Sequence, residues 1–203
     1  MPPIPRFTCA CRKAGLFLGV LLLAGCAAQR VAPDSASPTR DALSAFSIEG
    51  RFSLHQEDKN YSGRLSWRHQ GANNALMLSS PFGQGIAEIA TGESGAQLTT
   101  SDGKKYSAVD AETLTTQVLG YPLPLARLTD WVRGRGAPSA ASEVDTLGRL
   151  RHLRHDDWRI DFDYASDDPQ APPSALFARR GDGLELRLRI DEWTPLSSVD
   201  RTP

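Results

Sequence analysis

The chain has few cysteines and almost no excess of positive or negative charge. The 203 residues contain only three cysteines, Cys9, Cys11 and Cys26. No intrachain disulfide can therefore form beyond residue 26, and stability there has to come from an apolar core. The formal net charge is -1, and the 20 basic and 24 acidic residues that follow residue 25 give -4. This weakly acidic balance argues against binding to nucleic acid.

Catalytic motifs are also missing. The sequence contains no Gly-x-Ser-x-Gly, His-Glu-x-x-His or Walker pattern. We expect His55 and His69 on outward positions of strands, where an imidazole is solvated. His152 and His155 lie in a charged turn, and their spacing matches no established metal-ligand motif. We therefore expect no catalytic residue, metal or cofactor, and an envelope hydrolase is kept only as an alternative.

One short apolar run stands near the N-terminus. Residues 16–23 follow Arg12 and Lys13 and precede Ala24-Gly25-Cys26. The run is too short to span a bilayer, and this arrangement is typical of a secretory signal. Leu23-Ala24-Gly25-Cys26 resembles a bacterial lipobox, in which the cysteine is acylated and becomes the first residue. We predict that residues 1–25 are removed and that Cys26 is lipidated; an ordinary signal peptide with an incidental cysteine is the alternative.

The residues after the cysteine bear on location and on domain boundaries. In the enterobacterial sorting rule that this pattern resembles, Asp in that place retains a lipoprotein in the inner membrane. Ala27 therefore favours the outer membrane, with the protein facing the periplasm. Residues 26–39, rich in Ala, Ser and Pro, predict a lipidated flexible tether, with Ser37 and Pro38 starting a short helix. Residues 40–203 are long enough for one domain with a sizeable core.

Alternation of apolar and polar residues dominates that domain. Tyr61, Gly63, Leu65 and Trp67 share one side of an extended chain, as in a half-buried strand. Similar patterns before and after it give about ten to eleven strands. The period changes only in the middle, where residues 111–119, capped by Asp110, and residues 125–132 predict helices.

We therefore predict a mostly β fold, a single-domain open (incomplete) antiparallel β-barrel. Its mouth is covered by about three helices, and its concave interior holds an apolar cavity. Ordinary core packing remains the alternative for each inward residue.

A phenylalanine occupies an unusual place in one loop. Pro81 and Gly83 are typical of a turn, and they hold Phe82 between them. A phenylalanine at such a tip either folds back into the core or projects into solvent toward an apolar partner.

Taken in order behind the lipobox, these landmarks resemble the LolB family of outer-membrane lipoprotein receptors. The pattern runs from about Phe46 to Trp193 and includes Gly50-Arg51-Phe52, the strand ending in Trp67 and Ser80-Pro81-Phe82-Gly83. It also includes the block from Gly120-Tyr-Pro-Leu-Pro124 through Trp131 to Gly134, then Trp158 with Tyr164, and Asp191-Glu192-Trp193.

The resemblance implies an acceptor of lipoproteins from the periplasmic carrier LolA, which inserts them into the outer membrane. It implies that Pro81, Phe82 and Gly83 form the membrane-insertion loop, although most relatives carry Leu at the tip. It also implies that the interior receives acyl chains. The candidate cavity residues are Phe52, Leu65, Trp67, Leu76, Leu78, Leu114, Val118, Leu128, Trp131, Trp158, Ile160, Phe162, Leu186 and Leu188.

The expected partners are a LolA-type carrier, the acyl chains of its cargo, and the outer membrane through the lipid anchor, with the protein a monomer. Two other readings stay open. One is an envelope lipoprotein that carries another amphiphile, and the other is a structural scaffold whose barrel is filled.

Overall fold

The computed structural model describes residues 38–181 and 183–197. The predicted signal peptide, Cys26 and most of the predicted tether lie outside these residues. The described part is built from strands and short helices: η1 (Arg40–Ala42), β1 (Phe46–Gln56), β2 (Lys59–Gln70), β3 (Asn73–Ser79), β4 (Gly85–Gly92), β5 (Gly95–Thr100), β6 (Lys105–Ala108), α1 (Ala111–Leu119), α2 (Leu125–Val132), β7 (Ala141–Val144), β8 (Leu150–His155), β9 (Trp158–Asp163), β10 (Ala175–Arg180) and β11 (Leu184–Pro195).

The strands form one antiparallel 11-stranded sheet in the order β6-β5-β4-β3-β2-β1-β11-β10-β9-β8-β7. Every neighbour pair except β1 and β11 is consecutive in the chain, so local hairpins build two halves and the β1–β11 pairing joins them. β6 and β7 are opposite edges and do not pair with each other, so the barrel is open. The predicted fold class and strand number are confirmed.

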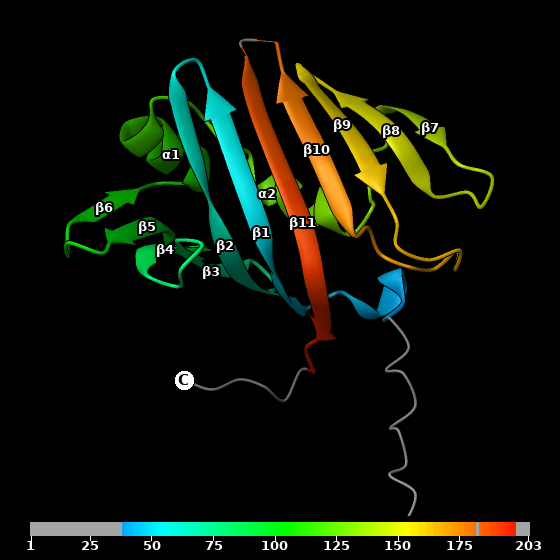
Figure 1. The fold of residues 1–203 in the computed structure, drawn as a ribbon, viewed down its shortest axis with the longest axis horizontal. Helices are drawn as coiled ribbons and strands as arrows, with labels where there is room; N and C mark the ends of the chain where they lie inside the picture. The colour runs from blue at the N-terminus through cyan, green and yellow to red at the C-terminus, as the bar shows by residue number, and fades with distance from the viewer. Residues whose placement is uncertain (1–37, 182, 198–203) are drawn as a thin grey trace, which may run out of the picture. The chain divides into compact units, whose positions relative to one another are not determined.

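Both α-helices lie behind the sheet in Figure 1, on the same side of it. The Asp110 carboxylate caps α1 by accepting the Thr113 amide at 2.7 Å, and Gly120 ends the helix with a φ of 94°. α2 buries Leu125, Leu128, Trp131 and Val132, the apolar stripe that its sequence predicts.

The third expected helix differs from the prediction in two ways. η1 is a 3-10 turn that begins at Arg40 after Thr39, whereas Pro38 is not helical. None of its residues lines the cavity, and the Arg40 backbone amide donates to the Gln170 carbonyl at 2.9 Å, in the connection between β9 and β10. The expected cover of about three helices is therefore reduced to α1 and α2. The Ser37-Pro38 pair did not predict where this helix starts, because a single helical turn has too little apolar periodicity to fix its position in the sequence.

Two inward-facing glycines allow the sheet to curve tightly. A Cβ on Gly50 would lie 2.2 Å from the Arg189 carbonyl oxygen, and one on Gly63 would lie 2.0 Å from the Ser79 carbonyl oxygen. Both contacts lie at register shifts, between Glu49 and Gly50 and between Leu78 and Ser79. Bulges with glycine are the usual means of bending a sheet. The Phe52 ring lies beside the bare Gly63 backbone, with Cε1 3.3 Å from that Cβ position.

We expect Gly50→Ala to lower the free energy of unfolding by about 1–3 kcal/mol, because its Cβ can be placed only by moving backbone. Gly85→Ala is the matched control, since nothing lies within 4 Å of its Cβ position. Urea unfolding followed by circular dichroism measures both. Equal stability of the two variants would contradict the close approach of β1 to β11.

Candidate functional site

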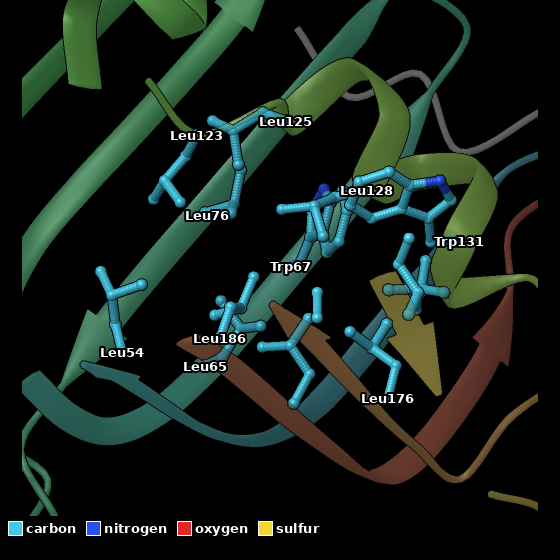
Figure 2. Close-up of a cluster of buried hydrophobic side chains, with 14 of the residues drawn as sticks. Leu54, Leu65, Trp67, Leu76, Leu123, Leu125, Leu128, Trp131, Leu176 and Leu186 are labelled. Carbon is cyan, nitrogen blue, oxygen red and sulfur yellow. The ribbon is translucent and has the colours of Figure 1, made fainter. Parts of the chain in front are cut away.

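The space between the helices and the sheet contains an apolar cavity of about 530 Å³. That volume falls within the roughly 300–1,000 Å³ typical of ligand pockets. β1–β5 and β11 form its wall, and α1, α2 and the segment between them cover it. Figure 2 shows Leu54, Leu65, Leu76, Leu123 and Leu186 among the side chains gathered around this interior. Of the described lining residues none is charged, so the cavity suits an apolar guest.

Nine of the 14 cavity candidates line this space, and they come from four strands and both helices. They are Phe52, Leu65, Trp67, Leu76, Leu78, Val118, Leu128, Leu186 and Leu188.

The other five candidates are buried but do not line the cavity: Leu114, Trp131, Trp158, Ile160 and Phe162. The Trp131 ring of α2 lies 5.6 Å from the Trp158 ring of β9, centroid to centroid. α2 therefore contacts β9 directly at this point, and all five residues belong to the buried core. Alternation identifies inward residues but cannot tell where the covering helix makes contact.

Sequence reasoning missed several lining residues, which are Leu54, Asn60, Tyr61, Ser62, Ile86, Ala87, Ile89, Leu98, Thr100, Thr115, Leu119, Leu123 and Leu125. Leu54, Ile89 and Leu98 stand in alternating strand patterns that could have identified them. Leu123 and Leu125 stand in a proline-interrupted segment that has no period to follow.

Thr115 fixes the segment that connects the two covering helices. Its hydroxyl donates to the Ala111 carbonyl at 2.9 Å and accepts the Leu123 amide at 2.8 Å. Next to this joint Tyr121 is 3% exposed, and its hydroxyl has no partner among the described residues. Burial, with a smaller effect of nearby Tyr61, raises the pKa of Tyr121 to about 12, so the phenol stays neutral. The Thr115 hydroxyl thus ties the start of α2 to α1, whereas the Tyr121 hydroxyl adds no such bond among the described residues.

The cavity reaches the base of the loop Pro81-Phe82-Gly83 between β3 and β4, called the Phe82 loop below. Ile86, Leu78 and Ala87 line the cavity, and they stand at the two strand ends that the loop connects. The Ser80 amide donates to the Gln84 carbonyl at 2.7 Å, and the Gly83 amide donates to the Ser80 carbonyl at 2.9 Å. With Gly83 at a φ of 86°, this is a closed three-residue hairpin loop.

Phe82 itself is 95% exposed, the most exposed large apolar side chain of the described residues. Pro81 and Gly83 are exposed with it. Of the two positions open to Phe82, the structure therefore shows the outward one. Exposing a phenylalanine has an energetic cost in water, so an apolar partner is expected for it.

The expectation for His69 was wrong, whereas His55 is exposed as expected. His69 shares the inward side of β2 with Trp67 and is 7% exposed. Its Nδ1 lies 2.9 Å from the Asn74 Oδ1, which also accepts the Trp67 indole N–H at 3.0 Å. Burial lowers the pKa of His69, more than the hydrogen bond to Asn74 raises it. The cluster satisfies the indole polar group and leaves the Trp67 ring free to line the cavity.

His152 pairs with Asp161, at 2.7 Å between Nδ1 and Oδ1. Within residues 38–181 and 183–197, no group of three His, Cys, Asp or Glu side chains could hold a metal ion. No helix in that same part of the chain is long and apolar enough to cross a membrane.

Filling the cavity provides a direct test of its use. Ala87 faces inward on β4 and lines the cavity, whereas Ala90 on the same strand is exposed. We expect Ala87→Phe to lower the affinity for a fluorescent fatty acid at least about tenfold, equivalent to about 1.4 kcal/mol, because the ring takes the guest's space. Ala90→Phe is the control. Unchanged binding by Ala87→Phe, with a normal thermal unfolding curve, would place the ligand elsewhere.

The sequence matches known proteins over most of its length. The family model described as outer membrane lipoprotein LolB matches residues 44–193. An outer-membrane lipoprotein LolB from Dechloromonas aromatica is 40% identical over 186 residues, which cover 89% of this chain and 96% of the relative. Its counterpart from Azoarcus is 33% identical over 192 residues, covering 90% and 97%.

A solved LolA superfamily protein from Nitrosomonas europaea aligns with a TM-score of 0.44 at 7% identity, covering 79% of this chain and 95% of that one. The family assignment does not depend on that distant similarity. The family model and the relatives agree over nearly the whole described structure, and the chain belongs to the LolB family of outer-membrane lipoproteins.

Proposed function

We propose that this protein receives lipoproteins from a periplasmic LolA-type carrier and delivers them to the outer membrane. The observation that carries the proposal is the apolar cavity, which reaches the base of a loop with an exposed phenylalanine. The names of the relatives, outer-membrane lipoprotein LolB, support the location. Acylated Cys26 would hold the protein on the periplasmic side of that membrane.

The cavity provides for the acyl chains of the cargo. An acyl chain of about 15 methylenes costs on the order of 12 kcal/mol to expose to water, at about 0.8 kcal/mol each. A cavity lined by leucine, isoleucine and aromatic side chains removes most of that cost. Transfer from one apolar cavity to another then requires no nucleotide, because successively stronger binding provides the direction.

The Phe82 loop acts in the last step, the delivery of the cargo into the bilayer. Its hairpin hydrogen bonds fix the loop, and the ring has no contact to give up before it enters a bilayer. The cavity wall at Leu78 and Ile86 continues directly into the loop. Insertion of Phe82 would therefore bring the cavity mouth to the membrane, and the acyl chains could pass into lipid without crossing water.

No step of this function requires a bond to be made or broken. Burial, exposure and affinity suffice, and the relatives are named for their location rather than for a reaction. We accordingly propose a transfer protein and not an enzyme.

Phe82→Glu should separate the two steps, because it changes the loop and leaves the cavity intact. We expect the variant to take a lipoprotein from a loaded carrier at the wild-type level but to leave it uninserted in added vesicles. Pull-down measures acceptance, and flotation of the vesicles measures insertion. Val109→Glu is the matched control, because Val109 is 81% exposed and lies outside the loop. Normal insertion by Phe82→Glu would show that the loop is not needed for insertion.

A further inference from the structure

A row of three arginines crosses the outward face of the sheet at one level. In the strand register Arg64 of β2 lies opposite Arg51 of β1, and Arg51 lies opposite Arg189 of β11. All three side chains are exposed. Neighbouring strands lie about 4.8 Å apart, and like charges directly opposite each other destabilise a sheet. The row therefore presents guanidinium donors that an external anion can bind.

One carboxylate compensates part of this charge. The Arg51 guanidinium donates to both Asp191 oxygens, at 2.7 and 3.1 Å, and the Arg189 Nε lies 3.8 Å from Asp191 Oδ1. Asp191 stands at the bulge between the Glu49–Glu192 and Gly50–Ile190 pairs, and a bulge re-aims the side chain it carries. Among the described residues the Arg64 side chain makes no hydrogen bond or close ion pair, although its charge helps the Arg51 hydrogen bonds to lower the pKa of the Asp191 carboxyl. The row therefore keeps a net positive charge.

The row starts at the base of the Phe82 loop. Arg64 lies opposite Ser79, the last residue of β3, and the loop follows at once. The loop continues β3 in the direction of Ser62 and away from Ser66 on β2. The next level of the sheet on the far side from the loop contains the acidic pair Glu49 and Glu192. In the loop direction the same face continues with Ser53, Ser62 and Arg187, and the exposed β1–β2 turn at Glu57 and Asp58 lies beyond them.

We propose that Arg64, Arg51 and Arg189 form a headgroup row that binds the phosphates of anionic phospholipids while Phe82 lies in the bilayer. The proposal rests on the proposed function, since it deepens the membrane step. A bilayer surface offers an apolar layer and a layer of phosphates side by side, which matches an apolar loop with a basic row beside it. Guanidinium groups suit phosphate because they donate in pairs.

The test measures binding to vesicles by co-sedimentation. A chain that starts at Ala27 keeps every described element and the whole described core, and its cooperative unfolding is confirmed first. Vesicles of phosphatidylcholine are compared with vesicles that also contain phosphatidylglycerol. We expect the double variant Arg64→Gln, Arg189→Gln to bind the anionic vesicles on the order of tenfold more weakly, with no change on phosphatidylcholine. The difference should vanish at high salt.

Arg154→Gln with Arg159→Gln is the matched control. These two exposed arginines also lie opposite each other, on β8 and β9 of the same sheet, far along the strand order from the loop. The control should bind both kinds of vesicle as the wild type does. Equal loss in the control and in the row variant would show a general charge effect and overturn the proposal.

Two further outcomes distinguish this proposal from the function on which it rests. If the row variant binds anionic vesicles normally but takes less lipoprotein from the carrier, the row is a protein-docking surface and the lipid proposal is wrong. If Phe82→Glu inserts cargo normally, the proposed loop function fails, whatever the row binds. Weaker anionic binding by the row variant, with normal acceptance of cargo, supports the headgroup row.

Discussion

The pairing of β1 with β11 is the constraint on which the rest of the structure depends. It joins strands from the two ends of the domain and brings two sets of hairpins into one sheet. At Gly50 the two backbones approach so closely that a side chain is excluded, and the bulge there turns Asp191 outward. One local irregularity therefore contributes to the curvature around the cavity and also fixes the carboxylate within the arginine row on the opposite face.

The interior under the helices is packed in one part and hollow in another, because Trp131 of α2 meets the ring of Trp158 on β9, whereas Leu125 and Leu128 of the same helix line the cavity. Over β9 the rings of Trp131 and Trp158 meet, and the interior is packed. Over β1–β5 a cavity remains beneath the cover, whose two helices are joined by the Thr115–Leu123 hydrogen bond. A closely packed core stabilises the folded protein, whereas an empty apolar cavity lowers its stability, and an apolar ligand that fills the cavity can restore the lost contacts. The division thus gives the protein a rigid half and a binding half.

Much of the fold could be predicted from the sequence, because alternation in strands such as β2 and the caps at Asp110 and Gly120 are local signals. The position of His69 could have been read from its parity with Trp67. Whether Trp158 lines a cavity could not be predicted from the sequence, because it depends on where α2 packs against the sheet. The sequence left open whether Phe82 points inward or outward. The structure shows it pointing outward, from a loop that its own backbone hydrogen bonds close.

In the proposed function, the acyl chains of the cargo occupy the cavity between the helices and strands β1–β5 and β11. The most direct measurement is photo-crosslinking from a diazirine at the end of an acyl chain on a lipoprotein passed from a loaded carrier, with the labelled peptides identified by mass spectrometry. The account predicts adducts on lining residues such as Leu65, Leu78 and Leu186. Adducts confined to the exposed face of the sheet, or to the packed side around Ile160 and Phe162, would contradict it.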